Sequence, residues 1–211
     1  MRVIAGEWRG RRLHSPAGRD TRPTADKVRE AIFDVLSALL METPPQRAAT
    51  RDSALADQPA GVFSGLAVLD LFAGAGGLGI EALSRGAARC TFVERDPAAL
   101  ATLRGNLAVL GVDAARGHVV PADYRRALLT DARDGSVYTL VFVDPPYERY
   151  PQVEVELRRS LGGVLAPEAL VVVETRRRQE VDLSLSERRH KLYGVTQVVV
   201  LGASMSAKRE A

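Results

Sequence analysis

A glycine-rich segment at residues 70–79, here called the glycine loop, has the residue types of a nucleotide-binding site. Its sequence is DLFAGAGGLG, in which Gly74, Gly76 and Gly79 satisfy the pattern G-x-G-x-x-G. Such glycines let the backbone approach a bound nucleoside closely. Glu94 follows at the predicted end of the next strand, where an acid accepts hydrogen bonds from ribose hydroxyls. These features predict a site for a nucleoside-containing cofactor, and by themselves they also fit an NAD(P)-dependent oxidoreductase.

The acid at the start of the glycine loop favours a cationic cofactor. Asp70 lies at the predicted end of a strand, where its carboxylate would repel the pyrophosphate of a dinucleotide and attract a cation. S-adenosylmethionine carries both an ammonium and a sulfonium group. Asp70 therefore favours S-adenosylmethionine over NAD(P).

A second group of residues, DPPY at positions 144–147, has the chemistry to activate an exocyclic amine. On a purine, the lone pair of such an amine is delocalised into the ring, so acceptors must draw the nitrogen toward tetrahedral geometry. Asp144 and the carbonyl of Pro145 can accept hydrogen bonds from the two N–H groups of the amine, and Pro146 adds no competing N–H donor. The ring of Tyr147 can stack on the base, so Tyr147→Phe is expected to cost little. The base must be unpaired or flipped out of its helix to reach this site.

Alternating strands and helices are predicted to bring both groups to one edge of a sheet. Unbroken apolar strands joined by helices indicate a doubly wound α/β fold, which binds ligands at the carboxyl ends of its strands. The last two strands are separated only by a tight turn at Gly194, so they must pair antiparallel. The predicted strands are 66–71, 89–94, 119–122, 138–143, 170–174, 190–193 and 196–201, and the predicted helices run from the glycine loop to 85 and over 96–111 and 124–132.

The N-terminal region has a different pattern. Residues 2–13 are expected to form a hairpin of two short β segments that carries Trp8 between arginines. Apolar residues at helical spacing predict a helix from Thr24 to about Leu40. Thr24 would be its N-cap and Pro23 would precede it.

Cations gather at the start of this helix, where the helix dipole already favours negative charge. Arg22, Lys27 and Arg29 would suit an anion such as a phosphate, although Asp26 and Glu30 could neutralise the same charges. The phosphate interpretation makes this region a nucleic-acid contact. Its candidate RNA-binding residues are Arg9, Arg11, Arg12, Arg22, Lys27 and Arg29.

Composition argues against several other classes of protein. The chain has 211 residues, a net charge of +3 and an isoelectric point near 9.3. No apolar run approaches the roughly 20 residues that cross a bilayer, and the N-terminus does not resemble a signal peptide. We therefore expect a cytoplasmic protein. The single cysteine, Cys90, lies in an apolar run and the three histidines are scattered, so neither a nucleophilic thiol nor a metal site is expected.

The motifs in combination resemble those of class I methyltransferases, through the glycine loop, Glu94, the pair 122–123 and the DPPY group. More narrowly, residues 2–11 (RVIAGEWRGR), 22–24 (RPT) and 28–30 (VRE) resemble the bacterial 16S ribosomal RNA guanine-N(2)-methyltransferases. The resemblance covers nearly the whole chain. The segment 43–65 departs from it, because it is longer than the usual link of the family.

The resemblance implies a Rossmann-like fold with a mostly parallel seven-stranded sheet that ends in an antiparallel strand pair. The methyltransferase domain would span residues 66–203, preceded by an RNA-binding hairpin and helix at 1–42 and a flexible loop at 43–65. Residues 204–211 would be a tail.

The resemblance also implies roles for the site residues. Asp70, Phe72 and the glycines would contact the methionine part of S-adenosylmethionine, Glu94 the ribose and Asp123 the adenine amine. The DPPY group would hold a guanine of ribosomal RNA, either free or in an assembling small subunit. The protein is expected to act as a monomer.

Other functions are weighed against this one. A DNA adenine methylase shares the DPPY chemistry but normally needs a sizeable recognition domain, and no segment is left over for one. An RNA adenine methyltransferase stays open, because guanine rests on the resemblance alone. A non-catalytic RNA-binding module would leave the glycine loop and DPPY unexplained. Two acids outside the matched motifs, Glu81 and Glu174, are interpreted as solvated or structural.

Overall fold

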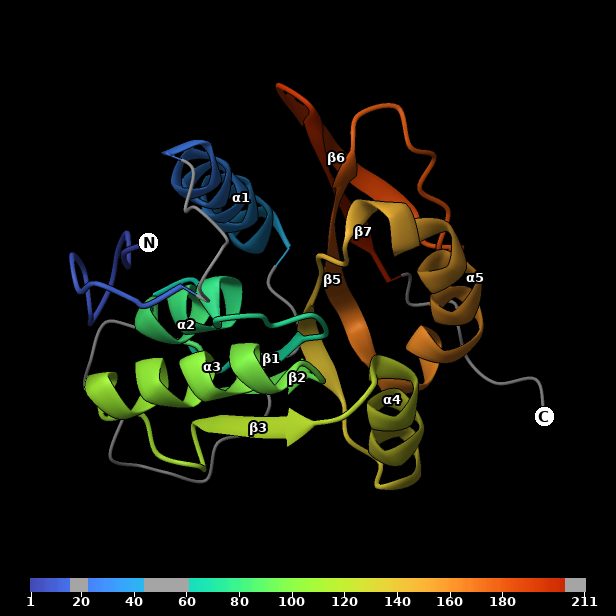
Figure 1. Cartoon of the computed structure of the whole chain (residues 1–211). Helices are drawn as coiled ribbons and strands as arrows, with labels where there is room; N and C mark the ends of the chain where they lie inside the picture. The colour runs from blue at the N-terminus through green and yellow to red at the C-terminus, as the bar shows by residue number, and fades with distance from the viewer. Residues whose placement is uncertain (16–22, 44–60, 204–211) are drawn as a thin grey trace.

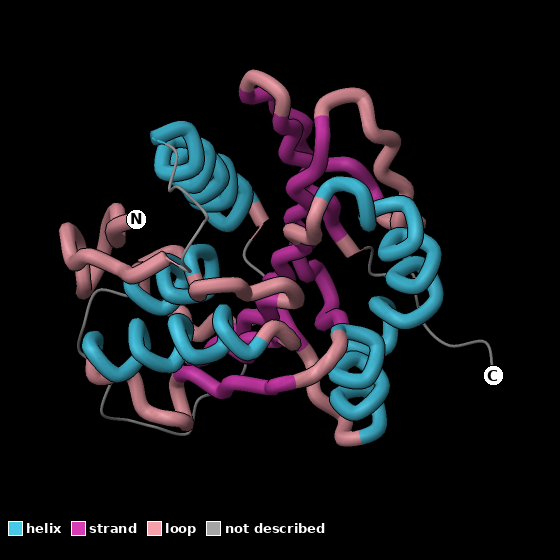
Figure 2. The backbone as a smooth tube through the Cα atoms, in the orientation of Figure 1, coloured by secondary structure: helices cyan, strands magenta, loops and turns pink. Residues whose placement is uncertain are grey.

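A seven-stranded sheet forms the centre of the protein, in the order β3-β2-β1-β4-β5-β7-β6 (Figures 1 and 2). The computed structural model of the protein describes residues 1–15, 23–43 and 61–203. Strands β1 to β5 run parallel, whereas β7 runs antiparallel to β5 and β6. This confirms the predicted fold class. The strands are β1 (Ala67–Asp70), β2 (Arg89–Glu94), β3 (Gly117–Pro121), β4 (Tyr138–Val143), β5 (Leu165–Arg176), β6 (Ser186–Tyr193) and β7 (Thr196–Gly202).

Helices cover both faces of the sheet (Figure 1). One face packs against α1 (Pro23–Glu42), α2 (Gly77–Ser84) and α3 (Pro97–Leu110). The other packs against α4 (Tyr124–Arg133) and α5 (Tyr150–Ser160). Both faces of strand β4 are buried, which explains why its residues are almost all apolar. Phe142 lies 5.8 Å from the ring of Phe33 in α1, while its neighbour Val143 joins the cluster on the opposite face.

Several predicted boundaries need correction. Helix α1 begins at Pro23, so Thr24 is not its N-cap. Strand β5 has 12 residues rather than the five of 170–174, because it extends on both sides of that apolar run. Helix α5 and the short 3₁₀ turns η2 (Tyr147–Arg149) and η3 (Leu161–Val164) were not predicted. Within the predicted loop at 43–65, residues 44–60 lie outside the described residues, as does the predicted tail.

Residues 1–15, here called the N-terminal arm, form a hairpin-like loop rather than two regular strands. One antiparallel bridge joins Arg2 and Arg12. The N–H of Val3 donates to the carbonyl of Arg11 at 3.0 Å. The predicted turn is present, but the strand pairing around it is limited to this one bridge.

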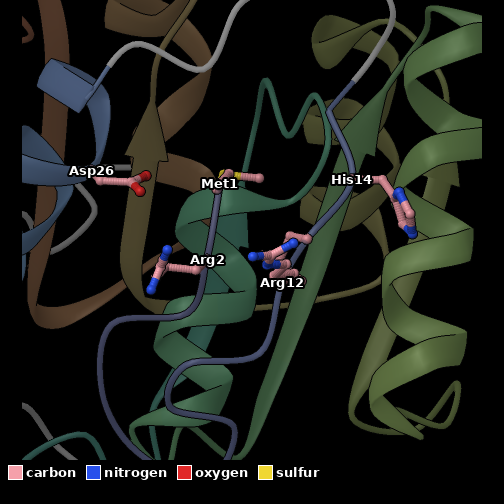
Figure 3. A pocket seen from close by; sticks show the side chains of 6 residues that line it. Met1, Arg2, Arg12, His14 and Asp26 are labelled. Carbon is pink, nitrogen blue, oxygen red and sulfur yellow. The ribbon is translucent and has the colours of Figure 1, made fainter.

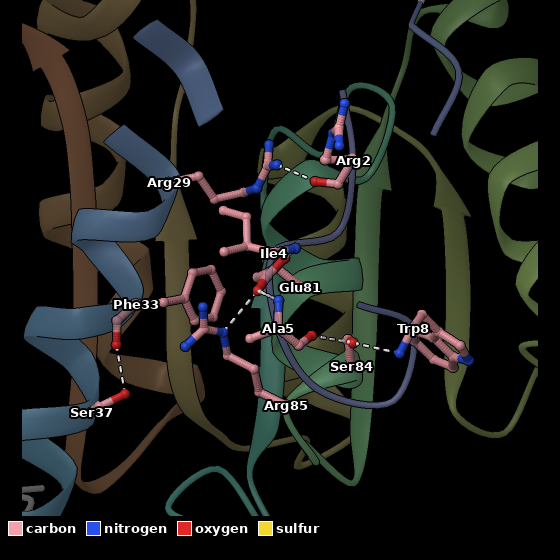
Figure 4. Close-up of polar contacts among 10 residues, drawn as sticks. All are labelled: Arg2, Ile4, Ala5, Trp8, Arg29, Phe33, Ser37, Glu81, Ser84 and Arg85. Carbon is pink, nitrogen blue, oxygen red and sulfur yellow. Dashed lines mark hydrogen bonds and ion pairs between the residues drawn. The ribbon is translucent and has the colours of Figure 1, made fainter. Parts of the chain in front are cut away.

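Side chains of α2, rather than extended strand pairing, fix the position of the N-terminal arm (Figure 4). The carboxylate of Glu81 is 1% exposed and accepts the backbone N–H groups of Ile4 at 2.8 Å and Ala5 at 3.0 Å. The same carboxylate pairs with Arg85 at 2.8 Å. A Cβ at Gly6 would lie 1.8 Å from the carbonyl oxygen of Ser84. The arm can therefore approach α2 this closely only because residue 6 is glycine. Glu81 is therefore structural, as one of its two interpretations proposed.

Candidate active site

The predicted site residues of three adjacent strands meet at one edge of the sheet. Asp70 ends β1 and is level with Phe92 of β2 on one side and Phe142 of β4 on the other. Glu94 ends β2, and Asp144 directly follows β4. Because the strands are parallel, the glycine loop, Glu94 and the DPPY group lie side by side at their carboxyl ends.

Two acids fix the glycine loop. The backbone N–H of Gly74 donates to Oε2 of Glu94 at 2.9 Å, and that of Gly79 donates to Oδ2 of Asp70 at 3.0 Å. A Cβ at Gly79 would lie 2.3 Å from the ring of Phe92, so glycine is needed for α2 to pack this closely on β2. The loop is thus shaped by the protein's own contacts.

Asp70 is the most buried of the predicted site acids, with 1% of its surface exposed. Burial, followed by the nearby charge of Glu94, raises the pKa of Asp70 to about 7, against the lowering effect of the bond from Gly79. In this structure the carboxylate of Asp70 therefore stabilises the glycine loop, through its hydrogen bond with the N–H of Gly79. Contact between Asp70 and a cofactor stays a prediction.

Glu94 and Asp123 lie at neighbouring strand ends. Oε1 of Glu94 accepts the backbone N–H groups of Arg95 at 2.7 Å and Asp96 at 2.8 Å. Asp123 is the N-cap of α4 and pairs with Arg125 at 2.8 Å and Arg95 at 3.3 Å. The hydrogen bond from the Arg125 side chain is the main reason why the pKa of Asp123 is lowered, so this group stays ionised.

Phe72 connects the glycine loop to α4. Its half-buried ring lies 5.1 Å from the ring of Tyr124, the first residue of that helix. This contact brings the glycine loop next to the start of α4, where Asp123 is the N-cap.

The DPPY group leaves the end of β4 in an extended turn. Asp144 is half-buried, Pro145 is buried and Pro146 is exposed. Tyr147 begins η2, and its half-buried ring is held by its hydroxyl, which lies 2.8 Å from Oγ1 of Thr196 and 3.5 Å from Oε1 of Glu174.

Glu174 and Thr196 are the two residues of this site that sequence reasoning missed. Burial raises the pKa of both Tyr147 and Glu174. Glu174 was interpreted as solvated or structural, and Thr196 was counted only as part of a strand. One signal was available for Glu174, because, like Asp144, it follows a buried apolar run in a parallel strand.

The predicted RNA-binding residues differ in their exposure to solvent. Arg9, Arg11, Arg12 and Lys27 are exposed, and Arg22 lies outside the described residues. The position of Arg29 argues against a direct contact with RNA. Arg29 is 5% exposed and donates to the carbonyl of Arg2 at 2.5 Å and to Asp26 at 3.1 Å, so its charge is used inside the protein. The alternative that Asp26 neutralises it locally is confirmed.

A cavity of about 460 Å³ lies between the N-terminal arm and α1 (Figure 3). It is adjacent to the arm rather than to the strand ends. The arm and the glycine loop are nevertheless joined through α3, since the side chain of Asn106 accepts the N–H of His14 at 2.8 Å and donates to the carbonyl of Ala75 at 2.9 Å. The cavity is lined by Met1, Arg2, Arg12, Leu13, His14 and Asp26.

In the part of the chain that the structure describes, no group of three His, Cys, Asp or Glu side chains could hold a metal ion. Burial raises the pKa of the Cys90 thiol well above its usual range. This is the opposite of what activates a thiolate. Over the same residues, no helix is long and apolar enough to cross a membrane.

The strand order, the antiparallel terminal pair and the acids at the strand ends define a class I methyltransferase fold. A solved Escherichia coli structure, the candidate methyltransferase yhhF, has a TM-score of 0.72 and 34% identity, covering 97% of this chain and 98% of that chain. Ribosomal RNA small subunit methyltransferase D of Escherichia coli is 37% identical over 175 residues, which is 83% of this chain and 74% of that protein. YlbH of Bacillus subtilis is 34% identical over 203 residues, covering 95% of this chain and 97% of that protein.

The family model described as Conserved hypothetical protein 95 matches residues 1–202. The chain belongs to this family, and it is also similar to ribosomal RNA small subunit methyltransferase D. The match begins at residue 1, so the N-terminal arm is part of the family pattern and not an addition to it.

Proposed function

We propose that the protein transfers a methyl group from S-adenosylmethionine to the exocyclic amine of a guanine in small-subunit ribosomal RNA. One observation carries the proposal. The DPPY group, with two acceptors for an amine and an aromatic ring, lies directly beside the glycine loop on adjacent strand ends. Similarity to ribosomal RNA small subunit methyltransferase D supports ribosomal RNA as the substrate.

The chemistry of the residues around the glycine loop fits this cofactor. Glu94 already accepts three backbone N–H groups, yet a carboxylate has about four acceptor positions, so it can also bind a ribose hydroxyl. Phe72 offers an apolar surface beside the loop, and Asp123 an ionised acceptor at the start of α4. When bound, S-adenosylmethionine supplies an electrophilic methyl group on its sulfonium.

Asp144 and Pro145 would orient the amine for transfer. The carboxylate and the carbonyl accept hydrogen bonds from the two N–H groups of the amine. This directs the nitrogen lone pair away from them and toward the glycine loop. Tyr147 supports the base plane through stacking. Asp144 can also take the proton that the nitrogen loses once its new bond to carbon has formed.

Exposed cations on the N-terminal arm and α1 would bind the RNA backbone. Arg9, Arg11, Arg12 and Lys27 are available for phosphate contacts, which give affinity and position without selecting a base. With Arg29 used internally, the phosphate site at the start of α1 has fewer cations than the sequence suggested.

Purified protein tests the proposal with isotopically labelled S-adenosylmethionine and four substrates: free small-subunit ribosomal RNA, assembled small subunits, large-subunit ribosomal RNA and duplex DNA. Digestion to nucleosides and mass spectrometry identify the product. We expect N²-methylguanosine in small-subunit RNA and none with Asp144→Ala. Methyladenosine as the labelled product would contradict guanine as the target and support the adenine alternative. Label confined to large-subunit RNA or DNA would contradict the substrate.

A further inference from the structure

Glu174 lies beside the DPPY group on the neighbouring strand. Val173 is level with Val143 in the parallel pair of β4 and β5, so Glu174, inside β5, is the next residue beside Asp144, which directly follows β4. Glu174 also lies opposite Val198 of β7, whose side chain packs on the α1 face of the sheet. Because residues directly opposite each other point to the same face, Glu174 points to that face too.

The contacts of Tyr147 place Glu174 at the far end of its ring. The Tyr147 hydroxyl lies 3.5 Å from Oε1 of Glu174 and 2.8 Å from Thr196. Asp144 precedes the same tyrosine by three residues in the chain, and, after burial, the charges of Glu174 and Asp144 both raise the pKa of the Tyr147 hydroxyl. Both acids therefore lie near this tyrosine, and a base that stacks on its ring would be within reach of them.

The carboxylate of Glu174 is under-used by the protein itself. It is half-buried, and none of the ion pairs among the described residues includes it. Its hydrogen bond within the protein is the long one from Tyr147. A partly desolvated carboxylate with one long hydrogen bond has acceptor capacity left for a ligand.

Guanine has a donor that matches this acceptor. Its Watson–Crick edge carries the exocyclic amine and, next to it, the N1–H. In the proposed function, Asp144 and the carbonyl of Pro145 accept both hydrogen bonds of the amine. The N1–H then still needs an acceptor. Adenine has an unprotonated N1 at the corresponding position, which has no hydrogen to donate to a carboxylate oxygen.

We propose that Glu174 accepts the N1–H of the target guanine and so selects guanine over bases with an unprotonated N1. The inference rests on the proposed function, since it specifies how the same site chooses its base. The rival role is purely positional. In that role, Glu174 only steadies Tyr147, and its removal affects every base that stacks there by the same factor.

The base 2-aminopurine separates the two roles, because it keeps the exocyclic amine of guanine but has no N1–H. The substrate is the small-subunit RNA fragment that contains the guanine methylated by the wild-type protein, with either guanine or 2-aminopurine at that position. Single-turnover rates on both RNAs are measured for wild type, Glu174→Ala and Glu174→Gln. The matched control is Glu180→Gln, which changes an exposed acid beyond the same strand.

We expect the wild-type protein and Glu180→Gln to prefer guanine by roughly 5- to 150-fold, the range for one good base contact. Glu174→Ala should bring the ratio close to one by losing rate on guanine, with unchanged affinity for S-adenosylmethionine. Glu174→Gln should give an intermediate ratio, because its amide is a weaker acceptor and can donate to an unprotonated N1. It also provides a variant of nearly identical size should the alanine variant fold poorly.

Two outcomes would overturn the inference: a Glu174→Ala ratio equal to that of wild type, or an equal decrease in rate on both RNAs. Failure of the proposed function looks different, because wild type would then form no N²-methylguanosine on any substrate.

Discussion

The hydroxyl of Tyr147 lies 2.8 Å from Oγ1 of Thr196, a residue 49 positions later in the chain. Thr196 is the first residue of β7, which runs antiparallel to its neighbours, so its N-terminal end reaches the edge where β4 and β5 end. The terminal strand pair therefore contributes directly to the candidate site. It fixes the orientation of the ring on which the target base is proposed to stack.

This bond revises what the sequence alone predicts for Tyr147. Stacking by itself predicts little cost for Tyr147→Phe, whereas the bond predicts a loss of about 0.5–1.5 kcal/mol in transition-state binding, roughly a 2- to 13-fold lower rate. Tyr147→Ala should lose about 1–3 kcal/mol through stacking in addition. Single-turnover methylation rates measure both. Thr196→Val should match Tyr147→Phe and Thr196→Ser should retain most activity, and equal rates for the valine and serine variants would exclude the bond as the cause.

Glu94 should contribute to cofactor affinity. Glu94→Ala removes an ionised acceptor and also frees the N–H of Gly74, so we expect binding of S-adenosylmethionine to weaken by about 1.5–3 kcal/mol. Glu94→Gln keeps one acceptor oxygen and should lose less. Titration calorimetry gives both values. Affinity at the wild-type level in a folded Glu94→Ala protein would remove Glu94 from the cofactor site.

Asp144 should act on the chemical step rather than on cofactor binding. We expect Asp144→Ala to slow methyl transfer by about 100-fold or more at unchanged cofactor affinity, because the acceptor acts on the transition state. Asp144→Asn is the matched control, since its carbonyl can still accept one N–H of the amine and should preserve more of the rate. Single-turnover rates and calorimetry on the same preparations decide it. A normal rate for Asp144→Ala would refute the role.

The raised pKa of Asp70 predicts a dependence of stability on pH. A carboxyl with a pKa of 3.8 when unfolded and about 7 when folded binds its proton more tightly in the folded state. Its stabilising contribution is therefore complete below pH 3.8 and is lost as pH rises through about 7, by at most about 4 kcal/mol. Asp70→Asn keeps an acceptor for the N–H of Gly79 and should remove this dependence. Denaturant unfolding between pH 5 and 8 measures it, and identical pH profiles for both proteins would contradict the prediction.

Exposed arginines of the N-terminal arm should control the salt dependence of RNA binding. Replacing Arg9, Arg11 and Arg12 by alanine should lower the slope of log affinity against log salt by roughly 0.7–0.9 for each phosphate that the variant no longer binds. The control is the double variant Arg133→Ala and Arg159→Ala, on α4 and α5, which cover the opposite face from the arm. Binding to small-subunit RNA at several salt concentrations tests this. An unaltered slope in the arm variant would mean that these arginines serve only solvation.

How far the sequence predicts the structure depends on the kind of interaction that fixes each element. Strands β2 and β4 match their predicted bounds, because in each a mostly apolar run is followed directly by an acid. Helix α5 was missed although Tyr150, Val153 and Leu157 have helical spacing, since Pro151 and the charged residues around them obscure the pattern. Two strands were predicted for the N-terminal arm. Its actual shape depends on hydrogen bonds to Glu81, a residue distant in sequence, so the local pattern could not show it.

The site shows the same division. Asp144 and Glu94 could be assigned from local motifs, because each directly follows or ends an apolar strand. The burial of Arg29 was not foreseen, because its charge was considered without its position beside Val28 and Ile32 on the buried face of α1. Glu174 and Thr196 were missed because their roles arise from the pairing of β5 with β7.

The most direct test of the central claim is nucleoside mass spectrometry of small-subunit ribosomal RNA from cells with and without the gene. Deletion should remove one equivalent of N²-methylguanosine per small subunit. A plasmid copy of the wild type should restore it, and an Asp144→Ala copy should not. An unchanged amount of N²-methylguanosine after deletion, or the loss of a methyladenosine instead, would contradict the proposal that this protein methylates a guanine of small-subunit ribosomal RNA.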